Sequence, residues 1–178
     1  NDHSLFKKVP CLFEGVKNIG VIGWGSQGSA QAQNLRDSLK KSDIDITIGL
    51  RKKSDEVEKL NFKQDSIHNV LQQSDLNILL ISDYGQVQMV DEIMKSLKPN
   101  STLGLSHGFL IKYCEDYGKT LRDDINIIGV CPKGMGKTVR EQYLNQSGIN
   151  SSIAVHQDVT GTANNIAIGW AAGIGSPI

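Results

Sequence analysis

A short apolar run that ends in a glycine-rich turn most constrains how this chain folds. Residues 19–28 read Ile-Gly-Val-Ile-Gly-Trp-Gly-Ser-Gln-Gly, a candidate strand followed by the pattern GxGxxG and a candidate helix. In such a turn Gly23 permits the bend, Gly25 lets a pyrophosphate approach the backbone, and Gly28 allows close packing of the helix on the strand. A bare structural turn would look similar, but the flanking strand and helix favour an anion site at the helix start. We therefore place a dinucleotide at Gly23, Trp24, Gly25, Ser26, Gln27 and Gly28.

The residues after the next candidate strand, Asp45–Leu50, indicate which dinucleotide is bound. Residues 51–54 read Arg-Lys-Lys-Ser, where an NAD-binding protein usually carries Asp or Glu. Cations and a hydroxyl suit the 2′-phosphate of NADP, and Arg51 can form two parallel hydrogen bonds to it. The simpler alternative is a solvated basic turn in which Ser54 caps a helix, and Ser54 can both cap the helix and contact the phosphate. We expect NADP(H) to be bound by Arg51, Lys52 and Ser54.

Length and composition fit one ordinary globular domain. The chain has 178 residues, 39% of them hydrophobic and 21% charged, with a formal net charge of zero. This balance gives no reason to expect nucleic acid or a membrane as a partner, and the apolar runs are too short to cross a bilayer. Three separated cysteines with no CxxC pair indicate a reducing compartment. The four histidines are scattered without the spacing of metal ligands, so no metal site is predicted. We expect one domain over residues 1–178.

Candidate strands and helices alternate along the chain. Beyond the first two strands, we predict strands at 76–82, 101–106, 126–130 and 153–156. Helices are predicted at 26–40, 87–97, 110–117 and 137–145, with polar helical turns between 54 and 73. This alternation predicts an α/β fold with a doubly wound parallel sheet, a Rossmann-like dinucleotide-binding domain.

Ligands of such sheets bind at the carboxyl ends of the strands. His107 follows a predicted strand between Ser106 and Gly108, which favours function over an ordinary loop histidine. Lys133, between a proline and a glycine, can offer a localised charge to a substrate oxygen, although it can also be a plain surface lysine. The strand-end candidates are Ser82, Asp83, Gln86, His107, Gly108 and Lys133.

Six ordered blocks of the chain resemble the ketol-acid reductoisomerases, or acetohydroxyacid isomeroreductases, and most of all their plant-type members. The resemblance runs from about Val16 to Pro177 and includes Leu-Gly-Leu-Ser-His-Gly-Phe at 103–109 and Val-Cys-Pro-Lys-Gly-Met-Gly at 130–136. Six blocks in order are more specific than a lone glycine fingerprint. The remaining blocks are residues 20–28, 30–38, 79–83 and 148–158.

The resemblance implies NADPH at the glycine loop, with Arg51 and Ser54 on its 2′-phosphate and Ser82 and Gln86 along the cofactor. It places His107 and Lys133 beside the reacting centre. The implied reaction is magnesium-assisted alkyl migration in an acetohydroxy acid (2-acetolactate or 2-aceto-2-hydroxybutyrate), followed by hydride transfer from NADPH. The products are dihydroxy acids of valine, isoleucine and leucine biosynthesis. Plant-type members work in plastids and bacterial ones in the cytoplasm, so we expect a plastid protein, with a cytoplasmic one as the alternative.

Two departures from the family pattern bear on function. Glu56 stands where plant-type members offer a second serine to the 2′-phosphate. The sequence also stops where family members continue into a helical domain that supplies carboxylates for two magnesium ions, so no metal ligand is assigned. We therefore expect this chain alone to bind cofactor without turnover. A non-catalytic NADP-binding or regulatory module, or another Rossmann reductase, is the alternative, and a homo-oligomer is left open.

Overall fold

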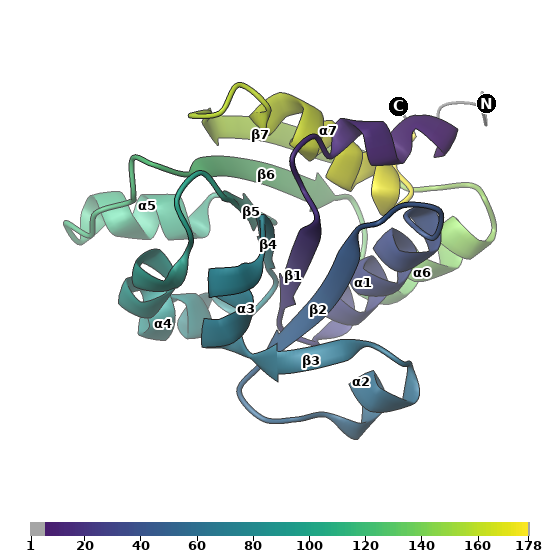
Figure 1. The fold of residues 1–178 in the computed structure, drawn as a ribbon, viewed down its shortest axis with the longest axis horizontal. Helices are drawn as coiled ribbons and strands as arrows, with labels where there is room; N and C mark the ends of the chain where they lie inside the picture. Colours follow the sequence, from purple (N-terminus) through teal and green to yellow (C-terminus); the bar gives the residue numbers. More distant parts are fainter. Residues whose placement is uncertain (1–5, 178) are drawn as a thin grey trace.

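A seven-stranded sheet forms the middle layer of the molecule, with helices on both faces (Figure 1). The computed structural model describes residues 6–177. The strands are β1 (Asn18–Ile22), β2 (Asp45–Leu50), β3 (Lys63–Ser66), β4 (Leu76–Leu79), β5 (Thr102–Leu105), β6 (Asn126–Pro132) and β7 (Ser151–Gln157). They lie in the order β3-β2-β1-β4-β5-β6-β7, and only the β6–β7 pair is antiparallel in this part of the chain. The strand order reverses between β1 and β4, where open α/β sheets bind their ligands.

The helices divide between the two faces of the sheet. One face is covered by α1, α6 and α7 and the other by α3, α4 and α5, while the short α2 lies at the β3 end (Figure 1). The helices are α1 (Ser26–Ser38), α2 (Asp55–Lys59), α3 (Ile67–Gln73), α4 (Asp83–Ser96), α5 (Phe109–Asp116), α6 (Gly136–Leu144) and α7 (Ala163–Gly173), after a 3-10 helix, η1 (Phe6–Leu12).

Each face of the sheet buries its own apolar cluster. Trp170 on α7 is fully buried in the first cluster, together with Val21 and Ile78 from the central strands. The second cluster joins Ile22 and Leu79 to the apolar faces of α3, α4 and α5. Because the central parallel strands are covered on both sides, their sequences are apolar without alternation. The predicted fold class is therefore confirmed.

The segment 54–73, predicted to hold polar helical turns, also contains a strand. It consists of α2, the edge strand β3 and then α3. β3 reads Lys-Gln-Asp-Ser, and three of its four residues are exposed. It pairs in parallel with β2, through Ile48 and Gln64 among others. Because β3 is an edge strand without an apolar face, its sequence shows no alternation of apolar and polar residues. The prediction of helical turns was therefore wrong at β3.

Three further differences concern the ends of elements. β7 is antiparallel to β6, whereas a wholly parallel sheet was expected. β4 ends at Leu79 instead of residue 82, and Ser82 instead caps α4 by accepting a hydrogen bond from the Gly85 backbone N–H. α7 was not predicted. Hydrophobic periodicity reports neither strand direction nor where a buried apolar run leaves the sheet.

Asp75, just before β4, ties together the amino ends of three strands. Its carboxylate accepts hydrogen bonds from the backbone N–H groups of Lys17 and Asn18, both at 2.8 Å, and from Lys98 Nζ at 2.5 Å. Its backbone N–H donates to the Asn18 carbonyl, and its carbonyl accepts from the Thr102 N–H. Burial raises the pKa of Asp75, but these bonds outweigh it and hold the pKa below its usual value of 3.8.

We expect Asp75→Asn to lower the free energy of unfolding by roughly 1–3 kcal/mol at neutral pH, because charge-assisted hydrogen bonds are lost. The folded-state pKa of Asp75 is lowered, so its stabilisation is present above the unfolded-state pKa and is lost as pH falls through the folded-state pKa. The difference between the two proteins should therefore shrink in acid. Urea unfolding across acidic and neutral pH measures this.

The matched control is Asp45→Asn, because Asp45 forms an exposed ion pair with Lys63 and should contribute little. A difference between wild type and Asp75→Asn that stays constant down to strongly acidic pH would show that the charge of Asp75 is not the cause.

Candidate functional site

The three glycines of the turn after β1 serve three different purposes. Gly23 has φ of +104°, a left-handed conformation that disfavours side chains. A Cβ on Gly28 would lie 2.3 Å from the Gly23 carbonyl oxygen, so a side chain there would push α1 off the strand. A Cβ on Gly25 would meet nothing within 4 Å. The space above Gly25 is therefore open to a ligand, as the sequence predicted.

The other residues of this turn contact neighbouring segments. The Trp24 ring packs edge-on against Phe62, with 5.6 Å between ring centroids. Gln27 donates from Nε2 to the Gly134 carbonyl at 2.8 Å and accepts at Oε1 from Gln31. The side chain of Gln27 is thus engaged within the protein, and its backbone amide is the group left for a cofactor. Gly25 occupies the cap position of α1 without a side-chain hydrogen bond, so the first amides of this helix are available to an anion.

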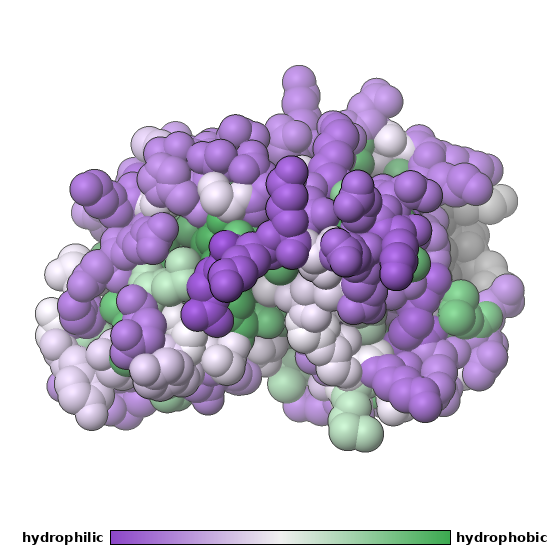
Figure 2. Space-filling view, turned by 90° about the horizontal axis from the view of Figure 1, so that it is seen from below, coloured by the Kyte–Doolittle hydropathy of each residue, from purple (hydrophilic) through white to green (hydrophobic). Residues whose placement is uncertain are grey.

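The basic loop after β2 lies at the carboxyl end of that strand. Arg51, Lys52 and Lys53 are exposed and form no salt bridge within residues 6–177. Ser54 takes the predicted cap position of α2, but its hydroxyl makes no capping hydrogen bond. Hydrophilic residues cover most of the surface at the β3 end of the molecule, seen from below in Figure 2. Glu56 is exposed in the first turn of α2, so its carboxylate shares this surface.

The structure brings His107 and Asp83 together from the ends of β5 and β4. His107 Nε2 lies 3.3 Å from Asp83 Oδ1, and about half of each side chain is exposed. The Phe109 backbone N–H donates to His107 Nδ1 at 3.4 Å, which assigns the ring proton of a neutral histidine to Nε2, facing the carboxylate. Gly108, open on its Cβ side, occupies the N-cap position of α5. The sequence predicted each residue but not the pair.

Gln86 is almost fully buried at the start of α4. Its Nε2 donates to the Ile81 carbonyl at 3.2 Å, while its Oε1 has no hydrogen-bond partner within residues 6–177. A buried acceptor without a partner costs free energy, so such groups often mark a place where a ligand or water completes the bonding.

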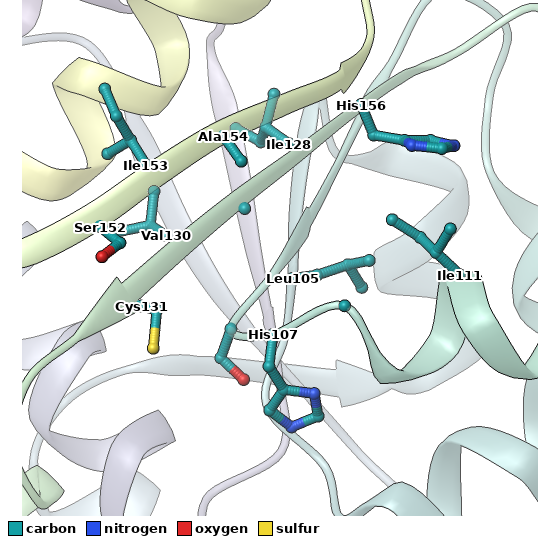
Figure 3. Close-up of a pocket in the computed structure, with 13 residues that line it drawn as sticks. Leu105, His107, Ile111, Ile128, Val130, Cys131, Ser152, Ile153, Ala154 and His156 are labelled. Atoms are coloured by element: carbon teal, nitrogen blue, oxygen red, sulfur yellow. The ribbon is translucent and has the colours of Figure 1, made fainter.

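A cavity of about 160 Å³ opens beside His107 and is lined by residues of β5, β6, β7 and α5. Figure 3 shows His107 and Cys131 near the strand ends and His156 on β7 at the other side. Gly129 and Ala154, which pair across β6 and β7, line it with little side-chain bulk. The polar side chains at this cavity are Ser106, His107, Cys131, Ser152 and His156. Ser152 and His156 were missed, because they reach this site through antiparallel register and not through a strand end.

Lys133 is exposed just after β6 and is not among the residues that line this cavity. Its backbone is nevertheless held, because its N–H donates to the Asn150 carbonyl at 2.8 Å. A Cβ on Gly136 would lie 2.0 Å from the Ser26 carbonyl oxygen, so this loop packs directly on the start of α1. The structure therefore sets the Lys133 loop against the glycine loop.

Neither a metal centre nor a membrane-spanning helix is found within residues 6–177. Nowhere in this range do three or more His, Cys, Asp or Glu side chains gather closely enough to bind a metal ion. None of its helices has the length and apolar character that crossing a bilayer requires. Residues 6–177 therefore offer no ligand set for the magnesium that the resemblance implies for the complete enzymes.

Comparison with known proteins gives the same picture as the geometry. Residues 14–177 match the family model described as acetohydroxy acid isomeroreductase, NADPH-binding domain. The chain belongs to this family. It is 50% identical over 189 residues to the chloroplastic ketol-acid reductoisomerase of Pisum sativum and 47% identical to that of Spinacia oleracea. The resemblance to ketol-acid reductoisomerases is thereby confirmed.

The match covers almost all of this chain and a smaller share of its relatives. It spans 98% of the chain but 32% of each plant reductoisomerase. A solved structure, an NADH-preferring ketol-acid reductoisomerase from an uncultured archaean, superposes with a TM-score of 0.79 at 27% identity. That superposition covers 94% of this chain and 50% of the archaeal one. Because this relative prefers NADH, cofactor preference within the reductoisomerases has to be tested on the residues of each chain.

We expect Gly25→Val to abolish dinucleotide binding while leaving the fold intact. The valine side chain fits the protein, since nothing lies within 4 Å of the added Cβ, but it fills the space that a pyrophosphate needs. Gly28→Ala should instead destabilise the fold, because its Cβ would meet the Gly23 carbonyl at 2.3 Å. Cofactor titration and thermal unfolding separate the two effects. Unchanged affinity in Gly25→Val would mean that the glycine loop is only a turn.

Proposed function

We propose that this chain is the cofactor-binding part of an NADPH-dependent ketol-acid reductoisomerase. The reaction is the isomerisation and reduction of 2-acetolactate or 2-aceto-2-hydroxybutyrate to dihydroxy acids, in valine, isoleucine and leucine biosynthesis. The observation that carries the proposal is the family match over residues 14–177 together with the open cradle above Gly25 at the switch point of the sheet. A plastid location is supported by the names of both plant relatives, which are chloroplastic.

The described residues fit NADPH. The amides after Gly25 face the pyrophosphate, while Arg51, Lys52 and the free hydroxyl of Ser54 bind the 2′-phosphate. Bound NADPH supplies the hydride for reduction. Its remaining contacts are assigned to the strand-end residues Ser82, Asp83, Gln86 and Gly108.

His107 and Lys133 are assigned to the reacting centre. His107 Nε2 lies 3.3 Å from Asp83 Oδ1 and its Nδ1 accepts from the Phe109 N–H, so these two contacts orient the ring beside the reacting centre. Lys133 contributes a positive charge that stabilises negative charge on an oxygen of the substrate. The loop of Lys133 is held on α1 through Gln27 and Gly136, which fixes this charge relative to the cofactor site.

Arg51→Ala should weaken NADPH binding about tenfold or more and leave NADH binding nearly unchanged, because a charge-assisted bond to the 2′-phosphate is lost. Glu56→Ser should tighten NADPH selectively by removing a repelling carboxylate. Titration with both cofactors measures this. Lys95→Ala is the control, since this exposed cation lies in the last turn of α4, which leads to the amino end of β5, whereas Arg51 follows the carboxyl end of β2. Equal losses for NADPH and NADH would contradict the phosphate assignment.

The 178-residue chain should bind NADPH yet show no reductoisomerase turnover, with or without magnesium. Alkyl migration needs divalent cations held by several oxygen ligands, and residues 6–177 offer no such group. Fusion to the helical domain of a plant reductoisomerase should restore turnover, and Lys133→Ala in the fusion should lower kcat by about a hundredfold or more. Lys137→Ala is the control, since Lys137 is an exposed lysine in the first turn of α6.

Two outcomes would count against this scheme. Magnesium-dependent turnover by the 178-residue chain alone would show that its site is complete. A fusion that binds NADPH and folds but stays inactive would favour the non-catalytic module.

A further inference from the structure

The side chain of Gln64 binds the backbone of the loop that carries the proposed 2′-phosphate residues. Its Oε1 accepts a hydrogen bond from the Ser54 N–H at 2.8 Å, and its Nε2 donates to the Ser54 carbonyl at 3.2 Å. One amide side chain thus satisfies both backbone groups of a single residue, much as a neighbouring strand would. β2 ends at Leu50, so this contact extends the attachment of the loop to β3 beyond the ladder itself.

The contact fixes the backbone of Ser54 and leaves its side chain free. Ser54 is extended, with φ of −122° and ψ of 122°, and its hydroxyl does not cap α2. A serine at a helix start ordinarily uses its hydroxyl for the cap. Gln64 holds the loop through the backbone of Ser54 alone, so this contact does not engage the Ser54 hydroxyl.

The far end of the same segment is tied to the pyrophosphate site. Arg36 on α1 donates to the Leu60 carbonyl at 2.6 Å, and its guanidinium lies 4.1 Å from the centre of the Phe62 ring. Phe62 in turn packs against Trp24 of the glycine loop. The segment between β2 and β3 is therefore held at both ends, by Gln64 near Ser54 and by Arg36 and Trp24 near Phe62.

We propose that Gln64 is a positioning residue for NADPH selectivity. It holds Ser54, and with it the neighbouring Arg51, where both meet the 2′-phosphate, so the inference rests on the phosphate site proposed above. The physical reason is preorganisation: an exposed arginine gains from a bidentate bond only when its backbone is already in place. NADH has no 2′-phosphate, so its binding depends little on this loop.

The test compares Gln64→Met, which keeps the length of the side chain but loses both hydrogen bonds, with Gln64→Ala. We expect the Kd for NADPH and for 2′,5′-ADP, which carries the 2′-phosphate without the nicotinamide half of the cofactor, to rise about five- to tenfold. The Kd for NADH should stay within about twofold, and so should that for 5′-AMP, which lacks the 2′-phosphate. Gln72→Ala is the matched control, because Gln72 is an exposed glutamine on α3 with no side-chain hydrogen bond within residues 6–177.

Arg51→Ala, measured beside Gln64→Met, separates the possible outcomes, and thermal unfolding shows whether each variant keeps its fold. If Arg51→Ala lowers NADPH affinity but Gln64→Met leaves the NADPH-to-NADH ratio unchanged, the positioning role of Gln64 is wrong and the phosphate site stands. If neither variant changes the ratio, the phosphate site itself is wrong. If Gln64→Met weakens both cofactors equally, Gln64 only supports the fold, and the proposal is overturned.

Discussion

The close approach of α1 to the end of β1 is the constraint on which the candidate site depends. Gly28 lies so near the Gly23 carbonyl that no side chain fits between them, and Gly23 makes the required left-handed turn. This contact aims the first amides of α1 at the switch point of the sheet, between β1 and β4. The Lys133 loop packs on the start of α1, and the basic loop follows β2, which pairs with β1.

α1 also carries a polar face that holds the helices of the Lys133 half of the site. Trp170 Nε1 donates to Gln31, Gln31 donates to Gln27, and Gln27 donates to the Gly134 carbonyl. Gln31 is fully buried, and a buried amide is favourable only in the register that satisfies its hydrogen bonds. This directional chain therefore selects one position of the loop of Lys133 relative to the pyrophosphate site. The same face of α1 continues through Asn34 and Ser38, which bond backbone carbonyls of α6 and α7.

The sequence predicted features that depend on local backbone and capping preferences, and it did not predict features that depend on contacts between residues far apart in the chain. The turn at Gly23 and the cap position of Ser54 could be predicted, because dihedral freedom and helix capping are local properties. The role of Gln27 could not, since its partner at Gly134 lies more than a hundred residues away. β3 was not predicted for a related reason: this polar edge strand is defined by its pairing with β2 and not by its composition.

The basic loop and the first turn of α2 together carry little net charge, so the positions of single side chains matter more than their summed charge. Residues 51–59 contain four basic and three acidic side chains, so the segment is close to neutral. Exposed charges at such distances are also screened at physiological ionic strength. The net charge of this segment is therefore a weak source of attraction for a 2′-phosphate, and the Glu56 carboxylate opposes it. The proposed selectivity for NADPH therefore depends on where Arg51 and Ser54 are held, and the described structure holds Ser54 through one glutamine on an edge strand.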